Sequence, residues 1–205
     1  MRFLIVFLLL LGSYSAQSQQ GISIEYERQS LKKLYPAQYS RFVFNDSFAF
    51  YYFFLKGYDP LKKSLFFSKS ILHHAIFYNK QDNIIYNHVN LPLGNTFLVT
   101  DTIKTNSWVT VPGEKNILGY KCISAINEDS KRGVTKIWYT SVLGTTLGHP
   151  WYAGLPGIPL EIIDFDRNWK ITATSVSYGK FQFALPDQTI LTRSEYNNRL
   201  EKKQY

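Results

Sequence analysis

The segment Ser47 to Leu55 constrains the fold most, because nearly every residue in it is apolar or aromatic. In an extended chain, successive side chains point to opposite faces. One face would carry Phe48, Phe50, Tyr52 and Phe54, and the other Ala49, Tyr51, Phe53 and Leu55. A strand that is apolar on both faces lies between two layers or lines a concave sheet. We therefore expect a central strand of a curved sheet here.

Short strands are predicted along most of the chain. Near the start, Ile22, Ile24 and Tyr26 alternate with Ser23, Glu25 and Glu27, as in a half-buried strand. Further strands are predicted at Ser64–Phe67, Ile71–Tyr78, Ile84–Val89, Thr96–Asp101, Trp108–Val111, Tyr120–Asn127, Val134–Thr140, Leu160–Asp164 and Trp169–Tyr178. Aromatic residues, which favour strands, make up 17% of the chain. The sequence therefore predicts a mainly β fold, built as a strongly curved antiparallel sheet that could form a half-barrel.

Helical pattern is scarce. Thr192 to Lys203 predicts a minor helix near the C-terminus, with Thr192 or Ser194 as its N-cap. Ser30 to Tyr39 has room for a short helical turn. Lys131-Arg132-Gly133, between two apolar runs, is typical of a hairpin tip.

The N-terminus has the pattern of a secretory signal peptide. Met1-Arg2 is a short positive region, and Phe3 to Leu11 is an unbroken apolar run. Such a run is too short to span a bilayer, which takes about 20 residues as a helix. Ala16 and Ser18 are small residues at the usual cleavage spacing. We therefore expect residues 1–18 to be a signal peptide and residues 19–205 to be one β-rich domain.

Export determines how the single cysteine and the basic charge are interpreted. Cys122 is alone, so it cannot close an intrachain disulfide. No cysteine lies near the cleavage point, so we do not expect a lipoprotein anchor. Loss of Arg2 with the signal lowers the formal charge from +8 to +7. The basic residues are dispersed, which favours solvated surfaces, or weak contact with an anionic membrane surface, over nucleic-acid binding. No transmembrane helix is expected in the mature chain.

Motifs that carry chemistry are scarce. The chain has no glycine-rich phosphate loop, no G-x-S-x-G elbow and no H-E-x-x-H. His73 and His74 would point to opposite faces of a strand, so we expect no metal site and no cofactor. Cys122 and His149 could serve as nucleophile and base. Because Cys122 lies in the middle of a predicted strand, a small buried hydrophobe is the better interpretation.

The most distinctive stretch runs from Trp151 to Ile162. Leu155-Pro156-Gly157-Ile158 places Pro and Gly at the central positions of a type II turn, which requires a positive φ at Gly157. The turn could be structural or part of a recognition loop, with Leu155 expected in the core. As candidate binding residues the sequence offers Trp151, Tyr152, Leu155, Pro156 and Gly157.

Several motifs, in this order, resemble the GLPGLI family of exported bacterial proteins. They are Trp108, then Ile117 to Cys122 with Ala125, then Ile137-Trp138-Tyr139-Thr140, then Gly148 and Pro150, then Gly154 to Pro159. The resemblance is strongest over residues 108–162. The chain departs from the family at Pro159 and at His149, which is inserted between Gly148 and Pro150. Because proline removes a backbone donor, Pro159 is expected at the start or edge of a strand. The resemblance carries over no established enzymatic activity, so it implies location and fold more than function.

The high aromatic content without a catalytic constellation favours a non-catalytic function. We expect a protein of the periplasm or outer membrane that binds an apolar ligand or a protein partner. Two alternatives remain at this stage: a hydrolase that uses Cys122 and His149, and a purely structural envelope component.

Overall fold

The computed structural model describes residues 18–54, 75–90, 96–103, 105–127, 135–144, 152–183, 185 and 187–201. Most of these residues lie in strands. The strands are β1 (Ser18–Ser30), β2 (Gln38–Phe44), β3 (Phe48–Phe54), β4 (Ile76–Asn79), β5 (Ile84–Asn90), β6 (Thr96–Thr102), β7 (Trp108–Ile117), β8 (Tyr120–Asn127), β9 (Thr135–Thr140), β10 (Ile158–Asp164), β11 (Trp169–Gln182) and β12 (Ile190–Thr192). The helix α2 (Arg193–Glu201) follows β12.

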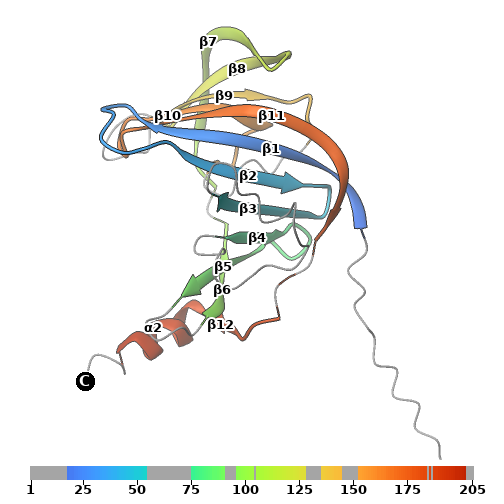
Figure 1. Cartoon of the computed structure of the whole chain (residues 1–205), viewed down its shortest axis with the longest axis vertical. Coiled ribbons are helices and arrows are strands. Elements are labelled where there is room, and N and C mark those ends of the chain that lie inside the picture. The colour runs from blue at the N-terminus through green and yellow to red at the C-terminus, as the bar shows by residue number, and fades with distance from the viewer. Residues whose placement is uncertain are drawn as a thin grey trace, which may run out of the picture.

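One sheet contains all the described strands, in the order β12-β6-β5-β4-β3-β2-β1-β11-β10-β9-β8-β7. Neighbouring strands are antiparallel, except that β12 pairs with β6 in parallel. The sheet twists and curves from β7 at the top of Figure 1 to β12 at the bottom, and it does not close. The prediction of a mainly β protein with a strongly curved antiparallel sheet and a minor C-terminal helix is confirmed.

The long strands β1 and β11 form the middle of this sheet. They pair along their whole length, from Ser18 opposite Gln182 to Ser30 opposite Trp169. A bulge between Glu25 and Tyr26 interrupts the register, and bulges increase the local bend and twist of a strand. In Figure 1 the two strands curve together.

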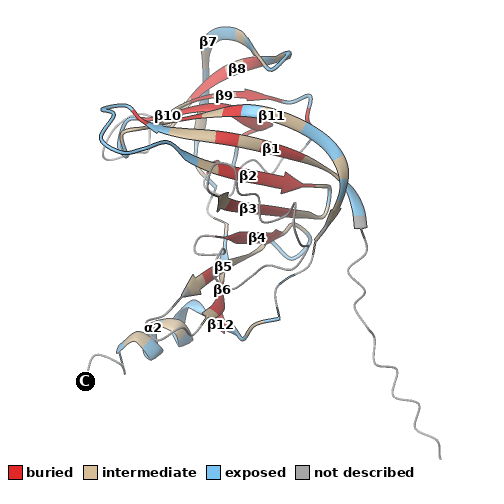
Figure 2. Ribbon diagram, viewed as in Figure 1, coloured by how far each residue is buried: buried red, intermediate tan, exposed pale blue. Residues whose placement is uncertain are grey.

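Strand β3 is buried on both faces, as its sequence predicts, and each face contributes to a different cluster. Ala49 and Tyr51 belong to the main core cluster, which also holds Ile24, Phe42, Cys122, Ile137, Leu155, Leu160 and Ile162. Phe50 and Tyr52 belong to a second cluster with Val43, Ala75, Phe77 and Leu98. The Phe50 and Phe77 rings stack with centroids 4.4 Å apart. Figure 2 shows the buried residues concentrated on the middle strands.

Helix α2 begins as the sequence predicts. The Thr192 hydroxyl accepts a hydrogen bond from the Glu195 backbone N–H at 3.2 Å. The Glu195 carboxylate in turn accepts from the Thr192 N–H at 2.7 Å. This reciprocal pair is a capping box, and it confirms Thr192 as the N-cap. Tyr196 and Leu200 pack against the small cluster of Phe97 and Leu191.

Pro159 lies at the second position of β10, where the predicted strand start is confirmed. It faces Tyr139 of β9, and the register with β9 shifts between Pro159 and Glu161. Pairing with β11 begins only at Glu161. The Pro159 carbonyl instead accepts a hydrogen bond from the buried Tyr26 hydroxyl at 2.8 Å. The absence of a backbone N–H at Pro159 therefore interrupts strand pairing only at the start of β10.

Within Ser30 to Tyr39, where a short helical turn was expected, the structure has one hydrogen-bonded turn, in which the Lys33 N–H donates to the Ser30 carbonyl at 3.0 Å, and no helix. Residues Leu31 and Lys32 form a turn, and strand β2 already begins at Gln38. Several other predictions lie outside the described residues: the signal peptide up to Gln17, the strand Ser64–Phe67, the first part of Ile71–Tyr78, and the hairpin tip Lys131-Arg132-Gly133.

Candidate binding site

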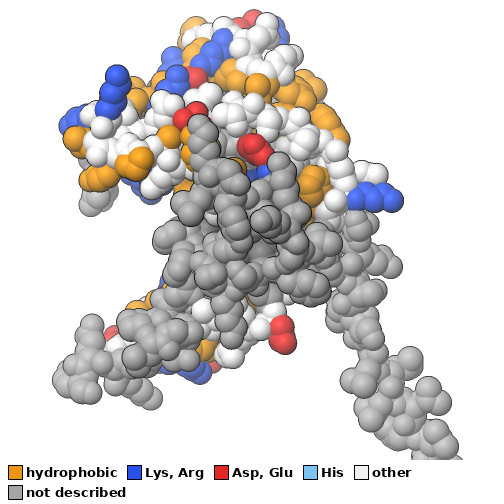
Figure 3. All heavy atoms as spheres, in the orientation of Figure 1, with side chains coloured by type: hydrophobic (Ala, Val, Ile, Leu, Met, Phe, Trp, Pro, Cys, Tyr) orange, Lys and Arg blue, Asp and Glu red, His pale blue; other side chains and the backbone are white. Residues whose placement is uncertain are grey.

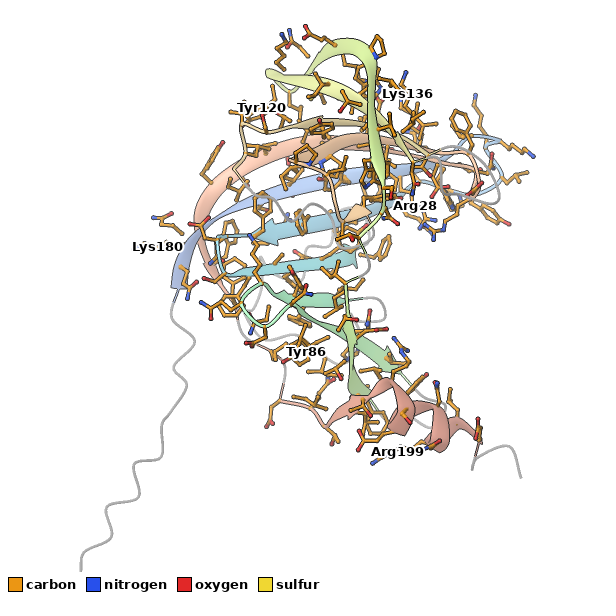
Figure 4. All side chains as sticks on the ribbon, turned by 180° about the vertical axis from the view of Figure 1, so that it is seen from behind. Arg28, Tyr86, Tyr120, Lys136, Lys180 and Arg199 are labelled. Atoms are coloured by element: carbon orange, nitrogen blue, oxygen red, sulfur yellow. The ribbon has the colours of Figure 1, made fainter. Side chains whose placement is uncertain are left out.

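A pocket of about 230 Å³ lies in the middle of the sheet, at the strand ends where β1 and β10 finish and β11 begins. We call it the Arg28 pocket. Its lining residues are Arg28, Tyr51, Tyr152, Asp164, Arg167, Trp169 and Ile171. Figure 4 labels Arg28 in this part of the molecule. The pocket thus combines charged groups with aromatic rings.

Strand periodicity places the charged groups on the face of the main core cluster. On β1, Ile24 and Tyr26 point into that cluster, and Arg28 is the next residue on the same face. On β10, Leu160 and Ile162 point into it, and Asp164 follows two residues later. On each of these two strands, the inward-facing residues named above are apolar except for the last one, which is charged.

The Arg28 guanidinium lies over the Trp169 ring, with its central carbon 3.9 Å from the ring centroid. This is the geometry of a cation–π contact. The Nε atom of Arg28 is buried and has no hydrogen-bond partner among the described residues. Burial lowers the pKa of Arg28, and the like charge of Arg167 adds to this, while Tyr51, Tyr152 and Asp164 act in the opposite direction.

Asp164 is buried, and both of its carboxylate oxygens are engaged by Arg167. The Arg167 backbone N–H donates to Oδ1 at 2.9 Å, and the guanidinium Nη1 donates to Oδ2 at 3.3 Å. The Arg167 side chain is otherwise largely exposed. Asp164 therefore orders the turn between β10 and β11 and holds Arg167 at the pocket.

The two pocket tyrosines are neutral. Burial raises the pKa of Tyr152 to about 12, and the nearby charge of Asp164 acts in the same direction. Burial likewise raises the pKa of Tyr51. Arg167 and Arg28 act to lower the pKa of Tyr152, but burial outweighs them. At neutral pH the charges of the pocket are therefore those of Arg28, Arg167 and Asp164, a net charge of +1.

Exposed apolar side chains lie on the two turns beside the pocket. Leu31, Leu34, Tyr35 and Phe165 are exposed by 41%, 64%, 62% and 56%; we call these four residues the apolar rim. The Leu31 N–H donates to the Asn168 carbonyl at 3.0 Å, which joins the two turns. The exposed Lys32 and Lys33 lie between the rim residues in sequence. Figure 3 shows hydrophobic and basic side chains together at this end, on the left.

The predicted binding residues are not gathered in one place. Trp151 lies outside the described residues. Tyr152 lines the Arg28 pocket. Leu155 is 1% exposed and belongs to the main core cluster, as expected. Pro156 is exposed, and Gly157 is buried. Of the four that the structure describes, only Tyr152 lines the pocket.

The predicted type II turn at Leu155 to Ile158 is wrong, because Gly157 does not have a positive φ. The positive φ, +99°, belongs to Gly154. Gly157 is needed for a different reason: a Cβ there would lie 2.3 Å from the Thr140 carbonyl oxygen. Close approach of two backbones, rather than left-handed conformation, explains the glycine.

Cys122 is fully buried, as its position in a strand predicts. Its thiol donates to the Tyr120 carbonyl at 3.5 Å. Burial raises the pKa of the thiol, which lowers the thiolate fraction that a nucleophile needs. The expected partner His149, like His73 and His74, lies outside the described residues.

Sequence reasoning missed most of the pocket, namely Arg28, Tyr51, Asp164, Arg167, Trp169 and Ile171. A usable signal was present in the strand alternation. Arg28 continues the series Ile22, Ile24, Tyr26, and a charged residue on the inner face of a strand is unusual unless it has a role there.

In the part of the chain that the structure describes, no helix is long and apolar enough to cross a membrane. The same part contains no cluster of three or more side chains suited to bind a metal ion.

Comparison with known proteins finds similar folds among solved structures. No protein-family model matches the chain, and no curated protein matches it. Among solved structures, it is similar to PNGF-II in two crystal forms. The C2 form is 18% identical, with a TM-score of 0.66 over 90% of this chain and 33% of that chain. The P21 form is 19% identical, with a TM-score of 0.66 over 90% and 34%.

An uncharacterised conserved protein from Thermus thermophilus also matches, at 10% identity and a TM-score of 0.49, over 84% of this chain and 90% of that chain. The chain spans about a third of the length of PNGF-II. The likeness to PNGF-II shows a shared fold for that part.

Proposed function

We propose that the chain is an exported, non-catalytic binding protein of the GLPGLI type, and that it binds an apolar ligand or a protein partner beside the Arg28 pocket, at the ends of β1, β10 and β11. The observation that supports this most is the apolar rim. Leu34, Tyr35 and Phe165 are each more than half exposed, and a contiguous exposed apolar patch of more than about a few hundred Å² marks a binding surface in soluble proteins.

The position of the rim supports the same proposal. Its two turns are tied to each other and to the pocket wall, because Tyr35 lies against Trp169 with ring centroids 6.0 Å apart. The rim is therefore held in place before any ligand arrives, which reduces the entropy lost on binding. Lys32 and Lys33 beside it favour weak contact with an anionic membrane surface in addition.

Cys122 gives no support to a hydrolase. A nucleophilic thiol must be reachable and partly ionised, and this one is fully buried with a raised pKa.

Export is tested by N-terminal sequencing of protein extracted from the envelope. We expect the mature chain to begin near Gln17 or Gln19. A sequence that begins at Met1 would contradict export.

Binding is tested by mass spectrometry of the lipids and proteins that co-purify with the chain from its native envelope. The test variant is Leu34→Ser with Phe165→Ser, and the control is Val142→Ser. Val142 is 72% exposed, but it lies far from the rim. It follows the end of β9, which pairs with the start of β10, whereas Phe165 follows the end of β10. We expect the co-purifying molecule to be lost from the double variant and retained by the control. Equal recovery from both variants would refute the proposal.

A further inference from the structure

The Arg28 pocket has an excess of positive charge that no described residue balances. Two guanidinium groups line it together with one carboxylate. Both oxygens of that carboxylate already accept hydrogen bonds from Arg167. Arg28 thus remains without an acidic partner in direct contact among the described residues.

Arg28 also has an unused donor. A guanidinium has five N–H donors in one plane, and carboxylate and phosphate oxygens match them best. Trp169 covers one face of the plane at 3.9 Å. A ring beneath the plane leaves the donors at its edge available, and Nε is buried with no acceptor among the described residues. Burial lowers the pKa of Arg28, as does the like charge of Arg167, and an anion in the pocket would oppose both effects.

The size of the pocket limits what it can hold. Pockets for drug-sized ligands measure about 300–1,000 Å³, and the Arg28 pocket measures about 230 Å³. It suits a small charged group with a few attached atoms, and the rest of such a ligand would lie outside. The apolar rim begins where the pocket ends, since Trp169 lines the pocket and contacts Tyr35.

We propose that the Arg28 pocket binds the oxyanion of an amphiphilic ligand, a carboxylate or a phosphate, while the apolar part of that ligand lies on the rim. Arg28 and Arg167 hold the anion, and Trp169 fixes the Arg28 guanidinium in place. This inference rests on the proposed binding function and specifies its ligand class. Fatty acids and anionic lipid headgroups share this chemistry.

Isothermal titration calorimetry of the purified full chain with decanoate, decanol and inorganic phosphate tests the inference. The variant Arg28→Met keeps an unbranched apolar side chain as far as the position of Nε, and it removes the charge and the donors. The control is Arg193→Met, because Arg193 is the first residue of α2 and pairs with Asp101 of β6, near the β12 edge of the sheet. Vesicles of phosphatidylcholine, with and without phosphatidylglycerol, test whether the anion is a lipid headgroup.

We expect decanoate to bind with at least tenfold higher affinity than decanol. We expect Arg28→Met to lose that difference while Arg193→Met keeps it, and Arg28→Lys to recover part of it, since lysine retains the charge without the planar donors. Binding of phosphatidylglycerol vesicles, but not decanoate, in an Arg28-dependent manner would support the inference with a lipid headgroup as the source.

The remaining outcomes would overturn it. Equal binding of decanoate and decanol, insensitive to Arg28→Met but lost in the rim variant, would leave the proposed function standing and refute the oxyanion. If inorganic phosphate bound as tightly as decanoate, the apolar part of the ligand would add nothing, and the proposal of an amphiphilic ligand would be refuted. A structural role predicts a lower melting temperature for Arg28→Met, whereas the ligand role predicts an unchanged or higher one, with decanoate raising the melting temperature of the parent only.

Discussion

Gly157→Ala should destabilise the protein strongly, although its backbone φ is not in the left-handed region. A Cβ at this position would lie 2.3 Å from the Thr140 oxygen, 2.7 Å from the Thr140 carbon and 3.0 Å from the Ser141 nitrogen. All three atoms belong to the backbone, so no side chain can rotate away. The clash lies next to the Ile158 and Thr140 pair that begins the β9–β10 ladder.

The size of the effect follows from what must move. Inserting a methyl group into a packed interior usually costs about 1–3 kcal/mol. Here β9 and β10 must separate, so we expect Gly157→Ala to cost about 3 kcal/mol, the upper end of that range. Gly119→Ala is the matched control, because Gly119 has φ +85° but an added Cβ would meet nothing within 4 Å. Conformational strain alone should cost about 1 kcal/mol there.

Urea unfolding of both variants, followed by tryptophan fluorescence, measures the two free energies of unfolding. Equal slopes with denaturant are required for the comparison, since a changed slope indicates a change in the denatured or native state. If Gly157→Ala cost less than Gly119→Ala, close approach would not be the reason for a glycine at position 157.

The remaining predictions concern buried groups. Cys122 should react slowly with a maleimide in the native state and quickly in denaturant, and Cys122→Ala should cost about 1 kcal/mol while sparing ligand binding; rapid labelling of the native protein would reopen the hydrolase alternative. Leu155→Asp should cost more than about 4 kcal/mol, since an unpaired carboxylate would replace a core side chain; a denaturation curve that overlays the parent would show that Leu155 is not core. Glu161 accepts hydrogen bonds from Lys115 and Lys170; burial acts to raise its pKa, but the two lysines outweigh burial and the net pKa is lowered. Because the pKa is lower in the folded state, this stabilisation is present at neutral pH and is lost as pH falls through the folded pKa. Glu161→Gln should therefore cost about 1–3 kcal/mol at pH 7 and much less at pH 3 in urea titrations, and a cost independent of pH would contradict the assignment.

The sequence predicted well those strands whose apolar and polar residues alternate, or whose residues are apolar on both faces. Strand β8 runs from Tyr120 to Asn127 as predicted, and β3 is buried on both faces. Strand β2 was missed because Phe42, Val43 and Phe44 are consecutive apolar residues without alternation, preceded by polar residues. Strand β12 has only three residues, and it exists because it pairs in parallel with the distant β6. No local signal encodes such a pairing.

The candidate site was harder to predict than the fold, because its residues come from separate parts of the chain. Arg28 and Trp169 approach each other only because β1 and β11 pair over their whole length. Tyr51 reaches the same pocket from β3. A single sequence gives the alternation within each strand, but not which strand lies beside which. The rim likewise depends on two turns far apart in sequence.

The motifs that resemble the GLPGLI signature explain packing rather than recognition. The Ala153 carbonyl accepts hydrogen bonds from the Trp108 indole and the Asn106 N–H, both at 3.0 Å. Next to it, a Cβ at Gly154 would lie 2.5 Å from the Asn106 oxygen. Leu155 then fills the core, and Gly157 abuts β9.

The structure thus explains Gly154, Leu155 and Gly157 by packing: all three are needed for this segment to lie against the sheet. The charged pocket residues Arg28, Asp164 and Arg167 all lie outside the 108–162 range of the resemblance. A protein with the same signature and different residues at these positions should keep the fold and lose the oxyanion site proposed above. The signature and the ligand are thus separable, and the pocket residues, rather than the signature, should determine what each such protein binds.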